Sequence, residues 1–303
     1  MEYVLQTSNL TKQYKKFRAL DNLSIAVPKG SIYGLIGKNG SGKTTLIRTI
    51  CGLQNPTSGS YCLYGINNSN AKIAKSRRRM GAVVETPAIY LDLTAEQNLT
   101  AQAIFLGLPT FTGITELLSL VGLSNAGTKK AKDFSLGMRQ RLGIAISLVG
   151  DPDFLVLDEP INGLDPQGII DMRELLLKLN RERQITILIS SHILDELSRL
   201  ATHYGFINHG QLIKEIDAAQ LEKQCRKCTR IKVNDTTLLP HALDLMRIEY
   251  RIHSHTEADL YAKPHVGQLT AALAKEGCEI ISIQEKDESL ESYFMNLVGG
   301  EEA

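Results

Sequence analysis

The sequence Gly37-Lys38-Asn39-Gly40-Ser41-Gly42-Lys43-Thr44 decides the fold of this chain. An apolar run typical of a buried strand precedes it at residues 31–36, and residues 42–50 have the pattern of a helix. The glycines permit a tight turn and a close approach of the backbone to an anion. Successive amide N–H groups at the positive end of a helix form a nest for phosphate. The stretch therefore predicts a site that holds phosphate groups.

The spacing Gly37-x-x-x-x-Gly42-Lys43-Thr44 matches the P-loop pattern, and it stands in the strand–loop–helix context that this pattern requires. Lys43 supplies a point charge for the β- and γ-phosphates of a nucleoside triphosphate. The Thr44 hydroxyl can ligate Mg²⁺. The residues of this stretch that we predict to bind the nucleotide are Gly37, Asn39, Gly40, Ser41, Gly42, Lys43, Thr44 and Thr45.

Two adjacent carboxylates at the end of a second buried strand supply the other half of the predicted site. The sequence there is Leu155-Val156-Leu157-Asp158-Glu159-Pro160. Carboxylates in this position beside a P-loop suit a Walker B role. Asp158 is expected to hold Mg²⁺ through water, and Glu159 is expected to polarise the attacking water as general base. The alternative, a capping carboxylate pair before a turn, becomes minor beside the P-loop.

Length and composition narrow the class of protein. A chain of 303 residues suits two domains, one of them large. The net charge of +1 gives no reason to expect a nucleic-acid partner. No apolar run approaches the roughly 20 residues of a transmembrane helix, and the N-terminal residues lack the features of a signal peptide. We therefore expect a cytoplasmic chain that reaches a membrane only through a partner.

The sequence predicts an α/β domain over residues 1–215 and a small α+β domain over residues 216–303. Alternation within residues 1–30 predicts short antiparallel strands. Apolar residues at helical spacing over about residues 86–150 predict a helical insertion. A parallel sheet covered on both faces is predicted by the short apolar runs at residues 31–36, 154–157 and 185–189.

The segment Phe134-Ser135-Leu136-Gly137-Met138-Arg139-Gln140-Arg141 resembles the signature motif of the ATP-binding cassette (ABC) ATPases, which usually reads Leu-Ser-Gly-Gly-Gln. Ser135 and Gly137 fall in place, whereas Phe134, Leu136 and Met138 depart from the common pattern. The resemblance implies contacts to the γ-phosphate from the Ser135 hydroxyl and the Gly137 amide. Ser135 is also well suited to cap the start of an amphipathic helix.

Further marks of this family follow in the expected order. Tyr14 resembles the aromatic residue that stacks on adenine, with a half-buried strand tyrosine as the alternative. The segment Asn162-Gly163-Leu164-Asp165 resembles the D-loop, and His192 resembles the switch histidine that contacts the γ-phosphate. The resemblance covers about residues 3–215. It implies an ATP-hydrolysing P-loop core with an antiparallel β subdomain and a helical subdomain, to which the small α+β domain is added.

Glu85 occupies the position where the Q-loop of this family has a glutamine. The sequence there is Met80-Gly81-Ala82-Val83-Val84-Glu85-Thr86-Pro87. A glutamine side chain donates and accepts hydrogen bonds, whereas an ionised glutamate only accepts them. A third carboxylate beside Asp158 and Glu159 adds like-charge repulsion unless Mg²⁺ is present. We therefore predict that Glu85 belongs to the catalytic and metal site and makes nucleotide binding more dependent on Mg²⁺.

The sequence around Glu85 also resembles a narrower group, the ABC ATPases of bacterial bacitracin-resistance and lantibiotic-immunity systems. This group carries glutamate at the Q-loop, a Ser-Leu-Gly-Met type signature and a C-terminal extension. The resemblance implies export or removal of an antimicrobial peptide, with the substrate chosen mainly by a membrane subunit. The matching stretches are Glu85-Thr86-Pro87-Ala88-Ile89-Tyr90, Leu93-Thr94-Ala95-Glu96-Gln97-Asn98-Leu99 and Tyr293-Phe294-Met295-Asn296-Leu297-Val298-Gly299-Gly300.

The family resemblance implies two macromolecular partners. Two copies of the chain would pack head to tail, so that the P-loop of one copy and Ser135 of the other enclose each ATP. A polytopic membrane permease would place a short helix in the groove around Glu85 and hold the chain on the inner face of the cell membrane. Thr86, Pro87 and Ile89 are the candidates for that surface. For Pro87, simple termination of a strand is an equally good interpretation.

A soluble ABC ATPase that acts on ribosomes or nucleic acid is the alternative function. Such proteins usually carry two cassettes or long coiled-coil inserts, whereas this chain has one cassette, no long heptad run and near-neutral charge. A non-catalytic regulatory cassette is disfavoured because Lys43, Asp158, Glu159 and His192 are all present.

The cysteines and histidines of the C-terminal part predict no metal site. Cys225 and Cys228 form a lone C-x-x-C without the second pair that a zinc site needs. We therefore expect ordinary reduced thiols and surface or structural histidines. The histidines, whose spacing matches no metal motif, are His241, His253, His255 and His265.

Overall fold

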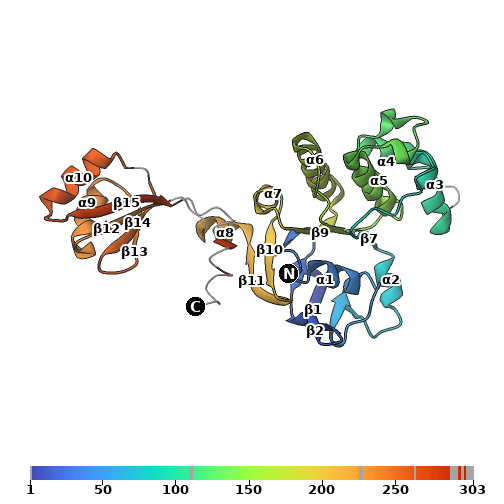
Figure 1. Ribbon diagram of the computed structural model, residues 1–303, viewed down its shortest axis with the longest axis horizontal. Coiled ribbons are helices and arrows are strands. Elements are labelled where there is room, and N and C mark those ends of the chain that lie inside the picture. Colours follow the sequence, from blue (N-terminus) through green and yellow to red (C-terminus); the bar gives the residue numbers. More distant parts are fainter. Residues whose placement is uncertain are drawn as a thin grey trace. The chain divides into compact units, whose positions relative to one another are not determined.

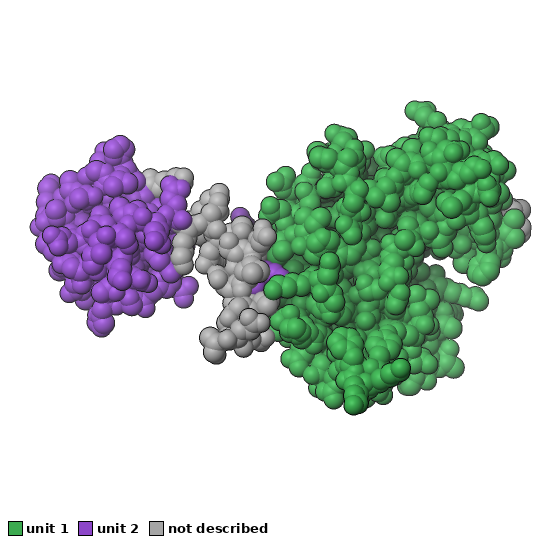
Figure 2. Space-filling view, viewed as in Figure 1, with its two compact units in different colours: residues 1–218 green, residues 219–303 purple. Residues whose placement is uncertain are grey.

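The computed structural model describes residues 2–108, 112–224, 228–262, 264–286, 293–294 and 297. The chain divides into two compact units, residues 1–218 and residues 219–303, which Figure 2 shows in green and purple. Each unit has a hydrophobic core of its own. Within the described residues, no helix is both long and apolar enough to cross a membrane.

The first unit is built on a six-stranded sheet with the strand order β11-β10-β4-β9-β8-β7. Its first five strands along the chain are parallel, and β11 pairs antiparallel with β10 at one edge. Every residue of β4, β8 and β9 is buried, which explains why these strands have continuous apolar sequences. The expected α/β fold class is confirmed. The strands are β4 (Ile32–Ile36), β7 (Met80–Val83), β8 (Phe154–Asp158), β9 (Thr186–Ser191), β10 (His203–Asn208) and β11 (Gln211–Asp217).

Helices cover both faces of this sheet (Figure 1). On one face, α1 (Lys43–Ile50) buries Leu46 and Ile47 in a cluster with side chains of the sheet. On the other face, α6 (Pro166–Arg183) starts after Asp165, whose side chain accepts a hydrogen bond from Gly168 N. A proline in the first turn and an aspartate cap are strong start signals for a helix. The short helix α7 (Leu194–Ser198) follows β9.

A second, antiparallel sheet packs on the α1 side and has the order β2-β1-β5-β6, with β3 paired to β1. Its N-terminal strands were expected from the sequence. Its later strands bury Tyr61 and Leu63 at alternating positions, a pattern of period two that sequence reasoning left unused. The strands are β1 (Tyr3–Tyr14), β2 (Phe17–Leu23), β3 (Ala26–Pro28), β5 (Ser58–Leu63) and β6 (Ile66–Asn67). The short helix α2 (Ile73–Arg77) follows β6.

The helical part of the first unit begins later than the apolar spacing suggested. Thr94 and Gln97 form a capping box, in which each side chain bonds the backbone N–H of the other residue, so α3 starts only at Ala95. Ser135 caps the last helix in a similar way. The elements are α3 (Ala95–Phe105), α4 (Ile114–Leu120), the 3₁₀ turns η1 (Ser124–Ala126) and η2 (Ala131–Asp133), and α5 (Leu136–Leu148).

The second unit contains a four-stranded antiparallel sheet with the order β13-β14-β12-β15. The element order βαββαβ with this strand order is the ferredoxin-like arrangement. Helices α9 and α10 contribute Leu243, Leu269 and Leu273 to a core with one face of the sheet. The elements are α8 (Ala218–Gln224), β12 (Cys228–Val233), η3 (Thr236–Leu238), α9 (Leu239–Leu245), β13 (Tyr250–Ile252), β14 (Glu257–Leu260), α10 (Val266–Lys275) and β15 (Ile280–Lys286).

Candidate functional site

The loop between β4 and α1 has a backbone that only glycine fits at two points. Gly42, directly before the first helical residue, has a φ of 109°, in the region that L side chains rarely adopt. A Cβ atom on Gly42 would also lie 2.6 Å from the carbonyl oxygen of Ala19. A Cβ atom on Gly37 would lie 2.5 Å from the carbonyl oxygen of Ile207. The loop is therefore closely packed from behind, and the N-terminus of α1 forms the positive end of a dipole.

Lys43 is buried, with 5% of its surface exposed, and is held by the loop that it follows. Its Nζ donates to the carbonyl oxygen of Gly37 at 2.7 Å and to that of Lys38 at 3.3 Å. The same Nζ lies 3.2 Å from Oε1 of Glu159. A buried ammonium group must be paired, and these three oxygens supply the pairing. The predicted phosphate-binding lysine is therefore in direct contact with the predicted general base.

Glu159 stands between Lys43 and His192 at the end of β8. Its Oε2 lies 2.8 Å from Nδ1 of His192, which directly follows β9. The backbone of Glu159 has a φ of 49°, an uncommon value for a residue other than glycine. Such conformations are costly and tend to occur at functional sites. The adjacent parallel strands β8 and β9 thus bring the two residues together, although they are separated by 33 positions in the sequence.

Asp158 is almost completely buried, and only one of its oxygens has a protein partner. Oδ1 accepts a hydrogen bond of 2.6 Å from Ser190 Oγ, which itself accepts one of 2.9 Å from the Glu159 backbone N–H. Oδ2 is buried without a hydrogen-bond partner among the described residues. An open carboxylate oxygen suits a hard cation such as Mg²⁺ or a water bound to it. Sequence reasoning missed Ser190, whose hydroxyl at the end of an apolar strand was the available signal.

Glu85 lies in the turn after β7 and has a charged partner. Both of its carboxylate oxygens accept hydrogen bonds from Arg48 Nη2, each at 2.8 Å, and both side chains are about half exposed. The repulsion predicted from a third carboxylate is therefore offset by a cation on α1. The sequence did not single out Arg48, because nothing in the local pattern distinguishes it from a solvated helix residue. The catalytic and metal-binding role of Glu85 stays a prediction.

Tyr14 ends β1 with its ring partly exposed. Its hydroxyl donates to Gln54 Oε1, and Gln54 Nε2 donates to the carbonyl oxygen of Thr45 at 2.9 Å. The ammonium group of Lys12 lies 5.2 Å from the centroid of the Tyr14 ring. The tyrosine is thus tied through Gln54 to the first turn of α1, and its exposed ring can take a stacking partner. Gln54 is a second residue that sequence reasoning missed.

The signature residues lie at the exposed start of α5. Ser135 Oγ accepts a hydrogen bond of 3.3 Å from the Met138 backbone N–H, as expected for a helix cap. A Cβ atom on Gly137 would meet nothing closer than Leu164, at 3.7 Å. Ser135 is exposed and Gly137 partly so, which leaves both accessible to a second molecule.

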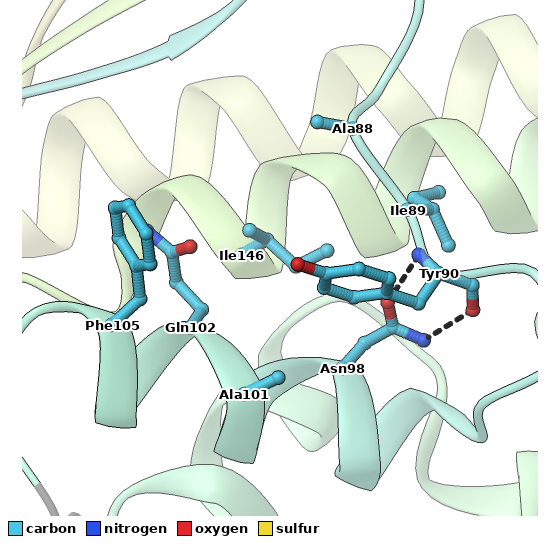
Figure 3. A pocket seen from close by; sticks show the side chains of 8 residues that line it. All are labelled: Ala88, Ile89, Tyr90, Asn98, Ala101, Gln102, Phe105 and Ile146. Carbon is cyan, nitrogen blue, oxygen red and sulfur yellow. Dashed lines mark hydrogen bonds between the residues drawn. The ribbon is translucent and has the colours of Figure 1, made fainter.

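Cavities with apolar walls adjoin the helical part. One of about 430 Å³ is lined by Val84, Thr86, Pro87 and Gly143, and one of about 350 Å³ is shown in Figure 3. Pro87 packs on α5 so closely that a Cβ atom on Gly143 would lie 2.5 Å from it. The cavities share Ala88 and Ile146. The residues lining the cavity in Figure 3 are Ala88, Ile89, Tyr90, Asn98, Ala101, Gln102, Phe105 and Ile146.

Asn98 fixes the loop that lines the cavity in Figure 3. Its Oδ1 accepts from the Tyr90 backbone N–H at 2.8 Å, and its Nδ2 donates to the Tyr90 carbonyl at 3.1 Å (Figure 3). The rings of Tyr90 and Phe105 are nonetheless mostly exposed. Exposed aromatic side chains beside an apolar cavity are typical of a protein-binding surface.

Most of the cysteines and histidines lie in the described part of the chain. No group of three or more potential metal ligands occurs there. Burial raises the pKa of the Cys51 thiol to about 12, so this thiol stays protonated at neutral pH. His253 Nε2 donates to Asp259 Oδ2 at 2.6 Å, which gives it a structural partner. Cys225 lies outside the described residues, and Cys228 is buried.

Comparison with known proteins places these features in a family. Residues 20–162 match the family model described as ABC transporter. The bacitracin transport ATP-binding protein BcrA of Bacillus licheniformis is 42% identical, with 99% of both chains covered. The lantibiotic transport ATP-binding protein SrtF of Streptococcus pyogenes is 44% identical over 72% of this chain and 93% of its own.

Solved structures agree with the sequence relatives. The dimeric post-hydrolysis state of the ATP-binding cassette MJ0796 with ADP and Pi superposes with a TM-score of 0.64 at 26% identity, covering 71% of this chain and 98% of that one. A nucleotide-free ATP-binding cassette from an ABC transporter superposes with a TM-score of 0.66 at 29% identity, covering 74% and 94%.

Proposed function

The chain belongs to the ATP-binding proteins of ABC transporters, and from this premise we propose that it powers a permease that exports, or protects against, antimicrobial peptides of the bacitracin or lantibiotic type. Like other members of the family it binds and hydrolyses ATP. The catalytic assignment rests on one observation, the Glu159 carboxylate held between Lys43 and His192. Residues 1–215 would form the ATPase domain, and residues 216–303 an accessory domain.

Lys43 is proposed to exchange partners when ATP enters. Its Nζ contacts Glu159 Oε1 in this structure. A γ-phosphate carries more negative charge than a carboxylate and is therefore the stronger competitor for an ammonium group. The exchange would free Oε1 of Glu159 to accept a hydrogen bond from the attacking water.

Glu159 is proposed as the general base and His192 as the residue that holds it in place. His192 contacts Oε2, so the other oxygen is left to face the substrate. The left-handed backbone at Glu159 turns the carboxylate back toward the loop. The P-loop amides and Lys43 would stabilise the charge that develops on the γ-phosphate.

Thr44 and Asp158 are proposed to hold Mg²⁺. The unpartnered Oδ2 of Asp158 fits a hard cation or its water, and Ser190 fixes the direction of this oxygen by binding Oδ1. When bound, Mg²⁺ would neutralise charge on the β- and γ-phosphates. Ser190 would then be a positioning residue for the metal-binding carboxylate.

A second copy of the chain is proposed to complete the site. Ser135 and Gly137 lie at an exposed helix start, where they could reach the γ-phosphate held by a partner. A two-fold, head-to-tail dimer would make the two composite sites identical. Tyr14 would stack on the adenine ring, with Gln54 fixing the tyrosine hydroxyl.

The permease is proposed to bind at the cavities around Pro87 and Phe105. These cavities combine apolar walls with the exposed rings of Tyr90 and Phe105 (Figure 3). An amphipathic helix that inserts apolar residues into such a groove would be recognised by this surface. Through this contact the chain would lie on the inner face of the cell membrane.

The test of this function is a resistance assay in a bacterial host. The chain is expressed with the membrane protein that co-purifies with it, and the minimal inhibitory concentrations of bacitracin and a lantibiotic are measured. The matched control is the same pair with Glu159→Gln. We expect higher inhibitory concentrations only with the wild-type chain, because only that chain turns over ATP.

Two results would contradict the proposal in different ways. If the pair forms and hydrolyses ATP but resistance does not change, the peptide substrate is wrong. If the chain co-purifies with ribosomes or nucleic acid and with no membrane protein, the soluble ABC ATPase is the better assignment.

A further inference from the structure

An ion pair joins the nucleotide helix to the loop at the permease groove. Arg48 belongs to α1, and its Nη2 donates to both carboxylate oxygens of Glu85 at 2.8 Å. Glu85 directly precedes Thr86 and Pro87, which line the larger cavity. Its φ of 59° is rare for a residue with a side chain, so the surrounding structure holds this turn. The pair thus connects the helix behind the phosphates with the surface proposed for the permease.

Arg48 also lies on the same face of α1 as the proposed metal ligand. Thr44 and Arg48 are four residues apart, so their side chains lie one above the other, about 6 Å apart along the helix axis. Both are partly exposed, whereas Leu46 on the opposite side of the helix is buried. Helical side chains tilt toward the N-terminus, which is the phosphate end of α1. The helix therefore places the Arg48–Glu85 pair on the same side of α1 as the proposed metal ligand, one turn further along.

We infer that Arg48 is a positioning residue that neutralises Glu85 in the nucleotide-free site and yields it when ATP and Mg²⁺ bind. An unpaired carboxylate near the P-loop would repel the phosphates, and the ion pair removes most of that repulsion. The cation that accompanies ATP then competes with Arg48 for the same carboxylate. The inference rests on the proposed function, since it requires ATP and Mg²⁺ at this P-loop.

The exposure of the pair suits such an exchange. The side chains of Arg48 and Glu85 are 44% and 52% exposed. Ion pairs with this exposure are weak, because water screens both charges. A pair that stabilises little can be broken at little cost when a divalent cation arrives. Arg48 therefore lowers the dependence on Mg²⁺ that the sequence alone predicts from Glu85.

The test is a double-mutant cycle with nucleotide affinity as the readout. Wild type, Arg48→Gln, Glu85→Gln and the double variant are titrated with a fluorescent ATP analogue, once in EDTA and once with Mg²⁺. We expect Arg48→Gln to weaken binding in EDTA about fivefold, the effect of one exposed ion pair, and to leave binding with Mg²⁺ unchanged or slightly tighter, because the cation no longer competes with Arg48. In the Glu85→Gln background, Arg48→Gln should change neither affinity. Arg48→Lys should restore wild-type binding in EDTA.

The cycle has outcomes that overturn the inference. If Arg48→Gln weakens binding in EDTA equally in the wild-type and Glu85→Gln backgrounds, Arg48 attracts phosphate directly. If it weakens binding in neither background, the ion pair has no effect on nucleotide affinity. Arg183→Gln serves as the matched control, since Arg183 pairs with Glu116 and ends α6, which does not contribute to the P-loop. A wild-type chain that neither binds nor hydrolyses ATP would refute the proposed function, whereas normal hydrolysis with a flat cycle would refute only the role of Arg48.

Discussion

Two buried carboxylates, one in each unit, have different surroundings. Asp158 in the first unit is 2% exposed, and its Oδ2 has no hydrogen-bond partner within the described chain. Asp259 in the second unit is 6% exposed, and both of its oxygens are paired, with Arg230 and with His253. A fully paired buried charge belongs to the fold, whereas an open one costs stability until a ligand arrives. The contrast distinguishes Asp158, a carboxylate suited to bind a ligand, from Asp259, a carboxylate that stabilises the fold.

The backbone beside the two carboxylates also differs. Glu159, next to Asp158, has a left-handed backbone. Asp259 lies in β14, in regular pairing with β12 and β13. Strain and open charges persist in proteins where function requires them, and the rest of the fold compensates for them.

The largest expected effect is the loss of turnover in Glu159→Gln. Glutamine keeps the shape of the side chain but cannot accept a proton, so the ATP turnover rate should fall by at least about 100-fold. Binding of ATP should persist or tighten, because one negative charge near the phosphates is removed. Phosphate release and nucleotide binding are measured on the same sample. Turnover near the wild-type rate would mean that Glu159 serves only as the partner of Lys43.

Asp158→Asn should next separate ligand binding from folding. Removing the open charge should leave the nucleotide-free chain as stable as wild type or more so. The stability that Mg²⁺ with ATP confers over the chain without ligand, about 2–3 kcal/mol at 100 times the dissociation constant, should be reduced. Thermal unfolding under the two conditions measures this difference. If the variant without nucleotide were strongly destabilised, Asp158 would stabilise the fold as Asp259 does, and the proposed difference between the two carboxylates would be wrong.

Asp259→Asn should have the opposite profile. It removes the charge that pairs with Arg230 in a largely buried position, so the second unit should lose about 2 kcal/mol of stability. The ATP turnover rate should be unchanged, because the site residues all lie in the first unit. Hydrogen exchange of peptides from β12 and β14, compared between variant and wild type in the full chain, measures the loss. Unchanged protection from hydrogen exchange would show that the pair of Asp259 and Arg230 stabilises the fold as little as a surface ion pair does.

The penalty of Asp259→Asn should also depend on pH. Burial raises the pKa of Asp259, but the hydrogen bonds from Arg230 and His253, together with their charges, outweigh it and leave the pKa at about 2, below the ordinary 3.8. A depressed carboxyl pKa stabilises the fold above the ordinary value, and the stabilisation is lost as the pH falls through the folded value. The difference between wild type and variant should therefore be full above about pH 4 and shrink toward pH 2. A difference that stays constant over this range would contradict the low pKa.

Sequence patterns predicted the parts of the site whose chemistry is local. Gly37, Gly42 and Lys43 belong to a turn and a helix start that are contiguous in the chain, so spacing alone predicts them. The apolar runs of β4, β8 and β9 likewise predicted the buried parallel sheet.

The partners that complete the site could not be predicted in the same way. Ser190 donates to Asp158 from the adjacent strand, and Arg48 donates to Glu85 from α1. Gln54 joins Tyr14 to α1 by a contact that spans 40 positions. Such contacts depend on strand order and on the path of the loops, which residue spacing does not encode.

The smallest expected effect concerns Tyr14, whose hydroxyl is held by Gln54. Gln54→Leu removes the partner of the Tyr14 hydroxyl and the bond to the Thr45 carbonyl. The ring would then be less well fixed for stacking on adenine, and ATP affinity should fall about threefold, the cost of about one hydrogen bond. Affinity for inorganic triphosphate, which has no base, should not change.

The two ligands decide whether Gln54 orients Tyr14 or merely supports the fold. Gln167→Leu is the matched control, since Gln167 bonds Asp171 on the surface of α6 and should affect neither ligand. An equal loss for ATP and triphosphate in Gln54→Leu would place its effect on the P-loop helix through Thr45. A loss for ATP alone would mean that Tyr14, like Asp158, is held in place for a ligand that the free chain lacks, in contrast to the paired charges around Asp259.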